Sequence, residues 1–256
     1  MKFQVLASGS KGNLTYIETE ESKIIIDAGI SLKDAKDRTT LEFDSLDAIF
    51  ITHEHIDHVK YIESIARKTN AIIFVNELSF KKMFLKYIKN LQGLKVKYIK
   101  PNEQIIFKDM KILPLNLQHD TESCYGYIFV SKGKSLAYCT DTGFIPLPYI
   151  DLLKNVNALI IEANHDIEML MNSDRSWYLK NRILSVNGHM SNKICGDILN
   201  KIIPNDTLKH IVLAHLSEEC NTMELAIDTV LSCIETDKIP QIYVAKQREA
   251  LQLLEV

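Results

Sequence analysis

The chain has 256 residues, a formal net charge of −3, 46% hydrophobic residues and 25% charged residues. These proportions are typical of a folded globular protein and exclude a disordered chain. The longest apolar runs, such as Ala48–Ile51, are far shorter than the roughly 18 residues of a membrane helix, and the N-terminus lacks the apolar core of a signal peptide. The five cysteines form no Cys-x-x-Cys pair, which suits a reducing compartment. We therefore expect a cytoplasmic protein with no membrane partner.

Short β-branched and apolar runs dominate the first part of the chain and then alternate with helical patterns. The first predicted strands are Phe3–Ala7, Leu14–Glu18, Lys23–Asp27, Asp47–Thr52 and Ala71–Val75. A helix near Glu77–Asn90 follows, and the next two strands form a hairpin over Gly126–Ser131 and Ser135–Thr140. The later predicted strands are Ala158–Glu162, His210–Ala214 and Gln241–Ala245. Helices are predicted between them at Ser191–Ile203 and Thr222–Glu235. No repeat or linker divides the chain, so we expect one domain over residues 1–256.

A cluster of metal-ligand residue types follows the apolar strand that ends near Ile51. Within six positions the chain presents three histidines and one aspartate, namely His53, His55, Asp57 and His58. Neutral imidazole is the commonest metal ligand in proteins, and a carboxylate adds a hard oxygen donor. No cysteine lies nearby, which argues against a closed structural zinc site. The segment therefore predicts two adjacent ions rather than a solvated loop.

Three further ligand types stand at the ends of distant predicted strands, namely His119, Asp141 and His215. Cys139 precedes Asp141 closely and could be read as a ligand or nucleophile. Small buried cysteines are common in strands, so packing is the favoured interpretation of Cys139. The cluster after Ile51 thus has the distant partners that a complete metal site requires.

In this order the residues resemble the signature of the metallo-β-lactamase superfamily over nearly the whole chain. The residues that carry the resemblance are Asp27, His53, His55, Asp57, His58, His119, Asp141 and His215. The resemblance implies an α/β metallo-β-lactamase fold, a four-layer αβ/βα sandwich. It implies that one ion is held by His53, His55 and His119. It implies that a second ion is held by Asp57, His58 and His215, with Asp141 bridging both. Asp27 would orient a ligand histidine, or form a turn before Gly29, and both zinc and manganese fit the donor set.

Two further motifs lie between Asp141 and His215, at Leu159–Asp166 and Asn187–Asn192. The stretch that contains the second motif resembles ribonuclease Z, whose catalytic histidine aligns with His189. Together with Ser8–Asn13 the motifs resemble the YycJ/VicX/WalJ family, compact bacterial nucleases that are regarded as DNA exonucleases. Two departures stand out. Asn172–Trp177 replaces a Gly-Pro-Tyr-Pro-like turn, which leaves substrate contacts open, and Ile56 replaces a more usual serine.

The resemblance implies a two-metal phosphodiesterase, most simply a DNA exonuclease acting 5′ to 3′. The ions would activate a bridging water for in-line attack, and His189, oriented by Glu162, would donate a proton to the departing oxygen. Asp57 counts among both the ligands and the catalytic residues. The alternatives are a small-molecule ester or thioester hydrolase of the same fold and a non-catalytic regulatory module linked to a two-component system. The His189 and Glu162 pair favours the nuclease, because ester chemistry does not need it.

Several polar residues have two competing interpretations. Ser10, Asn13 and Ser191 either hold phosphate oxygens or form turns, and Ser191 is also a candidate helix N-cap. His165 could be a ligand, a stacking residue or a structural residue. His189 could instead be a buried histidine before the predicted helix. The lysine-rich segment Lys81–Lys100 is either a solvated helix face or a ridge that binds a nucleic-acid strand.

Overall fold

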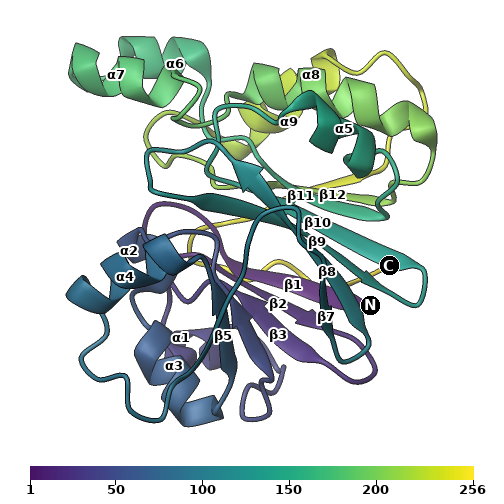
Figure 1. The fold of residues 1–256 in the computed structure, drawn as a ribbon. Helices are drawn as coiled ribbons and strands as arrows, with labels where there is room; N and C mark the ends of the chain where they lie inside the picture. Colours follow the sequence, from purple (N-terminus) through teal and green to yellow (C-terminus); the bar gives the residue numbers. More distant parts are fainter.

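The computed structural model describes residues 1–256 as two seven-stranded sheets packed face to face, with helices against both outer faces (Figure 1). The interface between the sheets is a buried aromatic layer. Phe50 stacks on Phe74 with ring centroids 4.6 Å apart and meets Tyr127 and Phe129 edge to face at 5.7 and 5.6 Å. Two further apolar clusters fill the space between each sheet and its helices. This is the predicted metallo-β-lactamase fold, a four-layer αβ/βα sandwich.

The first sheet has the strand order β14-β1-β2-β3-β4-β5-β6. Its strands are β1 (Lys2–Ala7), β2 (Leu14–Glu18), β3 (Lys23–Ile26), β4 (Ala48–Phe50), β5 (Ile72–Val75), β6 (Lys95–Tyr98) and β14 (Leu254–Glu255). Pairing is antiparallel from β14 to β3 and parallel from β3 to β6. The helices of this half are α1 (Leu32–Asp37), α2 (Ile56–Val59), α3 (Ile62–Thr69) and α4 (Glu77–Lys86). All three residues of β4 (Ala-Ile-Phe) are apolar and buried, which is typical of a parallel strand that is covered on both faces.

The second sheet has the strand order β13-β12-β11-β10-β9-β8-β7. Its strands are β7 (Ile105–Phe107), β8 (Met110–Leu117), β9 (Cys124–Ser131), β10 (Lys134–Cys139), β11 (Ala158–Glu162), β12 (His210–Ala214) and β13 (Gln241–Val244). Pairing is antiparallel from β7 to β10 and parallel from β10 to β13. Its helices are α5 (Leu147–Leu153), α6 (Ile167–Asn172), α7 (Trp177–Leu184), α8 (Asn192–Ile202), the short 3₁₀ helix Ile203–Asn205 and α9 (Met223–Ser232). Figure 1 shows α6 and α7 extending beyond the helices that cover this sheet.

Each predicted strand and helix is present, with ends shifted by a few residues. The helix predicted near Glu77–Asn90 ends at Lys86, and the strand predicted from Gly126 begins at Cys124. Ser191 is the N-cap of α8, because its side chain accepts a hydrogen bond from the backbone N–H of Ile194. No helix is both long enough and apolar enough to span a membrane.

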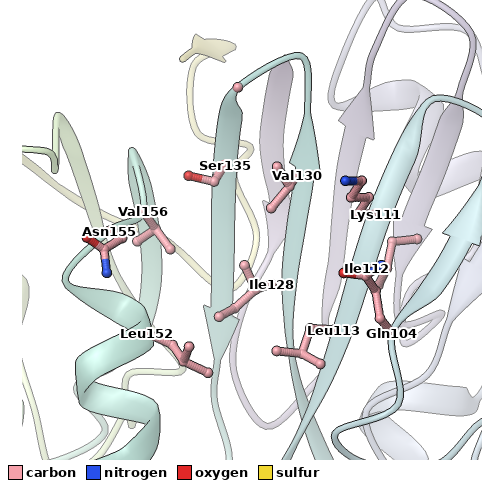
Figure 2. Close-up of a pocket in the computed structure, with 11 residues that line it drawn as sticks. Gln104, Lys111, Ile112, Leu113, Ile128, Val130, Ser135, Leu152, Asn155 and Val156 are labelled. Carbon is pink, nitrogen blue, oxygen red and sulfur yellow. The ribbon is translucent and has the colours of Figure 1, made fainter.

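A hollow of about 370 Å³ lies on the outer face of the second sheet beside α5. Figure 2 shows Leu113, Ile128 and Val130 on neighbouring strands and Leu152 on α5 around it. None of its lining residues belongs to the site that the sequence predicts. The predicted ligands lie elsewhere, beyond the ends of the strands.

Candidate metal centre

The predicted ligands meet at the carboxyl ends of strands from both sheets. The chain leaves β4 after Phe50, and His55 is the N-cap residue of the four-residue helix α2. The segment between the strand and the end of the helix carries four of the ligands. In the second sheet β10, β11 and β12 run parallel, so the residues after them share one edge, where open α/β sheets commonly bind ligands. Asp141 and His215 follow two of these strands.

One group consists of three imidazoles. His53, His55 and His119 each place a ring nitrogen within 4.8 Å of the others. His119 donates a hydrogen bond from Nδ1 to the carbonyl oxygen of Gly188 at 3.2 Å, which leaves Nε2 free for the group. Burial lowers the pKa of all three histidines. They are therefore neutral near pH 7, which is the form that binds a metal.

The second group combines two imidazoles with a carboxylate. Oδ2 of Asp57 lies 3.3 Å from Nε2 of His58 and 3.7 Å from Nε2 of His215. Burial alone would lower the pKa of His215, but Asp141, Asp57 and Glu162 together raise it to about 10. The two groups thus differ in charge, because the first contains only neutral imidazoles, whereas the second contains the Asp57 carboxylate and has Asp141 and Glu162 beside it.

Asp141 lies between the two groups. Its carboxylate oxygens are 3.4 Å from Nε2 of His58, 3.4 Å from Nε2 of His215 and 4.0 Å from Nε2 of His119. Burial would raise its pKa, but the charges of His215, His58 and His119 outweigh burial and lower it. Asp141 is therefore an ionised carboxylate within reach of both groups.

Asp27 lies beneath His58 and is fully buried. It accepts a hydrogen bond from Nδ1 of His58 at 2.7 Å and another from the backbone N–H of Thr52 at 2.9 Å. Because Nδ1 is occupied, Nε2 of His58 is the nitrogen that faces Asp57 and Asp141. A carboxylate that fixes a histidine in this way sets both its ring orientation and its tautomer.

Glu162, at the end of β11, contacts two histidines with one oxygen. Its Oε1 accepts hydrogen bonds from Nδ1 of His189 at 2.7 Å and from Nδ1 of His215 at 3.0 Å. Its Oε2 accepts hydrogen bonds from the backbone N–H groups of Thr142 at 2.9 Å and Met190 at 3.3 Å. Burial would raise the pKa of Glu162, but His189 and His215 hold it well below its usual range. The carboxylate is ionised and held at four points.

The donor set fits divalent metal ions. Three buried atoms in the cluster have no hydrogen-bond partner in the protein, namely Nε2 of His53, Oδ2 of Asp141 and Nε2 of His215. Buried polar atoms nearly always find a partner, so unpaired atoms on residues that group as possible metal ligands indicate a cation. Imidazole nitrogen and carboxylate oxygen together suit zinc and other divalent transition metals. The cluster is therefore suited to binding divalent metal ions.

The four residues considered for substrate binding have different surroundings. Ser10 lines a cavity of about 180 Å³ together with His189, His215 and two arginines. Asn13 is buried, and its amide nitrogen lies 3.1 Å from the carbonyl oxygen of Gly9 and 3.3 Å from a carboxylate oxygen of Asp57. Ser191 is buried and caps α8. Neighbours inside the protein engage the side chains of both Asn13 and Ser191, and their contacts with phosphate stay a prediction.

His165 is a buried histidine beside the site. Its backbone forms an isolated bridge with Ser191, and neither ring nitrogen has a hydrogen-bond partner. Burial lowers its pKa to about 4. It is not in any of the groups whose atoms converge as metal ligands. Its ring is therefore neutral near pH 7 and lies outside the ligand cluster.

Three residues around the ligands were not singled out from the sequence. Asp120 lies 3.2 Å from Nε2 of His119 and forms an ion pair with Arg182 at 3.2 Å. Asn164 donates to the carbonyl oxygen of His215 at 2.7 Å, and Ser8 accepts from the backbone N–H of His215 at 2.8 Å. Their only signal in the sequence is position, because Ser8 and Asn164 lie within motifs and Asp120 directly follows His119. Burial raises the pKa of Cys139 to about 12, which agrees with the packing role expected for it.

The fold and the donor set agree with comparisons to known proteins. The β-lactamase superfamily domain matches residues 22–215. The chain is 36% identical over 238 residues to exodeoxyribonuclease WalJ of Streptococcus pneumoniae serotype 2, covering 90% of this chain and 87% of that protein. It is 34% identical over 238 residues to exodeoxyribonuclease YycJ of Bacillus anthracis, covering 92% and 89%.

Among solved structures, the metallo-β-lactamase fold protein YhfI of Bacillus subtilis superposes with a TM-score of 0.74 at 16% identity, covering 98% of this chain and 99% of that one. That likeness supports the fold. The sequence matches show the family as well as the fold, because both relatives are more than 30% identical and align along most of their own length. The chain therefore belongs to the β-lactamase superfamily and, within it, to the group of hydrolases that includes the exodeoxyribonucleases WalJ and YycJ.

Proposed function

We propose that the protein is a two-metal nuclease that acts on DNA as an exonuclease. Two observations support this. The names of the relatives at 36% and 34% identity supply the substrate class. The arrangement of two ligand groups around Asp141, next to a histidine held by Glu162, supplies the chemistry. The 5′ to 3′ direction rests on family resemblance, and products with a 5′-phosphate follow if the 3′-oxygen is the leaving group.

Seven residues would hold the ions, which we propose are two zinc or manganese ions. They are His53, His55, Asp57, His58, His119, Asp141 and His215. Bound divalent ions lower the pKa of water and neutralise charge on a phosphodiester during in-line attack. The chain supplies the geometry, since Asp27 fixes His58 and Glu162 fixes His215. Asn13 supports Asp57 from below.

His189 carries the proposal of phosphodiester cleavage. Its Nδ1 is engaged by Glu162 at 2.7 Å, so Nε2 is the nitrogen available to a substrate. His189 lines the same cavity as the ligand His215, so a proton on Nε2 can reach a group that departs from phosphorus. An alkoxide is a poor leaving group, and a positioned acid typically contributes about 10²–10⁴-fold to its departure. Glu162 would act by orienting the imidazole through this hydrogen bond.

The alternatives account for fewer of the contacts. An ester or thioester hydrolase of this fold needs the metal ligands but has no evident use for His189 held by Glu162. A regulatory module would need neither the converging acceptors nor the buried carboxylates that surround them. A nuclease uses every one of these features.

The leaving group tests this role of His189. We expect His189→Ala to lower kcat on DNA by roughly 10²-fold or more. We expect a much smaller deficit on bis(p-nitrophenyl) phosphate, whose p-nitrophenolate departs without a proton. Metal content should stay at the wild-type level, because His189 is not one of the seven proposed ligands. His189 also groups with Asp141, Glu162 and His215 as a possible ligand, so unchanged metal content separates a proton donor from a ligand.

His210→Ala is the matched control, because His210 lies at the start of β12 and contacts the carbonyl oxygen of Glu255. Its kcat on both substrates should equal that of the wild type. An equal loss on DNA and on bis(p-nitrophenyl) phosphate in His189→Ala would remove the proton-donor role.

A further inference from the structure

A second hollow, of about 270 Å³, lies on the other side of the loop between β1 and β2 from His189. Four cationic side chains line it, namely Lys11, Arg38, Lys60 and Arg248. Asp34 is the one carboxylate among its lining residues. We call this hollow the basic pocket. Such a concentration of positive charge is unexpected in a chain whose net charge is −3.

Three of the four cations have no acidic partner. No carboxylate oxygen lies within the 4.0 Å of an ion pair from the side-chain nitrogens of Arg38, Lys60 or Arg248, whereas Lys11 pairs with Glu218. The guanidinium of Arg38 donates to the backbone carbonyls of Leu6 and Gln247 at 2.9 and 3.3 Å. The ammonium of Lys60 lies 5.2 Å from the centre of the Tyr61 ring. Asp34 and Glu218 lie near enough for the charges of Arg38 and Arg248 to lower their pKa values. The four cations outnumber these two carboxylates, so the pocket keeps a net positive charge that attracts anions.

The basic pocket is tied to the metal centre through the backbone. Lys60 is two residues beyond His58. The N–H of Asn13 donates to the carbonyl oxygen of Asp57 at 2.8 Å, and the N–H of Gly29, which lines the pocket, donates to the carbonyl oxygen of Asn13 at 2.9 Å. Ser10 lines the His189 cavity while its neighbour Lys11 lines the basic pocket. One short loop therefore separates the two spaces.

The lysine-rich segment Lys81–Lys100, the other candidate for a strand-binding surface, is compensated only in part. Four of its lysines have no carboxylate oxygen within the 4.0 Å of an ion pair, namely Lys86, Lys89, Lys95 and Lys97. Lys81 pairs with Glu77 at 2.9 Å, and Lys82 pairs with Glu122 at 2.9 Å and with Glu54 at 3.4 Å. An ion pair must be broken, or shared, before such a lysine can bind a phosphate. The basic pocket differs from this segment in its position, because backbone hydrogen bonds through Asn13 tie it to the metal centre.

We propose that the basic pocket binds a phosphate group of the nucleic-acid strand whose scissile phosphodiester lies at the metal centre. The inference rests on the proposed function, because it assumes a polyphosphate substrate. Arginine offers paired donors that match phosphate oxygens, and lysine offers a point charge. The same chemistry fits a terminal phosphate and an internal phosphodiester. Anchoring one phosphate beyond the loop fixes which neighbouring phosphodiester meets the metal ions.

Equilibrium binding tests the pocket without depending on turnover. The probe is a short single-stranded DNA with a phosphorothioate backbone that resists hydrolysis, labelled at its 3′ end and carrying either a 5′-phosphate or a 5′-hydroxyl. Fluorescence anisotropy gives Kd for metal-loaded wild type, Lys60→Ala/Arg248→Ala and Lys201→Ala/Lys209→Ala. Arg38 is left intact, since it holds two backbone carbonyls. Lys201 and Lys209 are exposed and lie near the opposite ends of α8 and β12 from the metal centre, so this control removes equal charge.

We expect Lys60→Ala/Arg248→Ala to raise Kd by about tenfold and to flatten the salt dependence of binding by about 0.7 units of slope, for one lost phosphate contact. The control should match the wild type. A loss confined to the 5′-phosphorylated strand identifies a terminal phosphate, and an equal loss with both strands identifies an internal one. Equal Kd values for the two double variants, both folded with the same Tm, would overturn the inference. If wild type binds DNA but hydrolyses none, the proposed function fails while the pocket stands.

Discussion

The two halves of the molecule, each a sheet with its helices, share one pattern of strand pairing but differ in the chemistry of their side chains. In each sheet, antiparallel strands are followed by three parallel neighbours, so β3 in the first half occupies the place of β10 in the second. Each of these strands is followed by an Asp-x-Gly sequence, which begins at Asp27 after β3 and at Asp141 after β10. Asp27 has φ 62° and Asp141 has φ 56°, which is a sparsely populated region for residues other than glycine. Equivalent positions thus carry equivalent strain.

The glycines that follow show why the plan is kept. A Cβ added to Gly29 would lie 1.7 Å from the carbonyl oxygen of Asp57, and one added to Gly143 would lie 2.4 Å from the carbonyl oxygen of Ser185. Both turns therefore press against a neighbouring backbone, which only glycine permits. The turn aims the preceding carboxylate at the centre of the site in each half.

What differs is the surroundings of each carboxylate. Asp27 is enclosed by Thr52 and Nδ1 of His58, so its oxygens are used inside the protein. Asp141 has an oxygen without any hydrogen-bond partner and lies 3.4 Å from both His58 and His215. The comparison teaches that position in the fold delivers a carboxylate, and its neighbours decide whether it orients a ligand or serves as one.

Substituting Asn at Asp141 should have the largest effect. Asn keeps the shape but removes the charge that both ligand groups share. We expect Asp141→Asn to lose metal and to retain less than about one-thousandth of the activity, because a direct ligand is lost. Elemental analysis of the purified protein measures the metal content. Wild-type occupancy in this variant would refute the proposed bridge.

Glu162→Gln should have an intermediate effect of a distinct kind. Gln keeps one carbonyl oxygen but loses the charge that His189 and His215 share. We expect kcat on DNA to fall by about 10²-fold and metal affinity to fall as well, since an outer hydrogen bond to a ligand typically accounts for 10–100-fold in affinity. His189→Ala should lose turnover alone. A Glu162→Gln protein with unchanged metal affinity would show that His215 does not depend on this carboxylate.

Replacing Asp27 by Asn should have the smallest effect of the three substitutions. Asp27→Asn removes the anionic partner of His58 without touching a bound ion. We expect metal affinity to fall by about tenfold and activity to return when metal is added in excess. Titration of activity against free metal measures both quantities. If excess metal does not restore activity, Asp27 is as essential to the metal centre as the proposed ligand Asp141.

The sequence predicts one half of the site more fully than the other, for a physical reason. In the first half, the ligands from His53 to His58 are adjacent in the chain, so their density alone is a signal. In the second half, Asp141 and His215 come from separate strands and depend on the parallel pairing that brings the strand ends together. Their residue types and strand ends are visible in the sequence, but their distances are not.

The direction in which each side chain points cannot be predicted from the sequence. Asn13 and Ser191 have the right residue types for phosphate contacts, yet one supports Asp57 and the other caps α8. The short helices α6 and α7 are also absent from the predicted elements, because six and eight residues show little periodicity. The equivalence of the two halves is hidden as well, since it lies in backbone pairing rather than in repeated residues.

Digestion of end-labelled DNA and RNA by metal-reconstituted protein tests the central claim most directly. The measurement compares single- and double-stranded forms of each nucleic acid, with and without a chelator, and identifies the products. The account predicts stepwise, metal-dependent shortening of DNA with 5′-phosphate products and loss of activity with chelator. Intact DNA in the presence of fully metal-loaded protein, together with hydrolysis of a small ester or thioester, would contradict it.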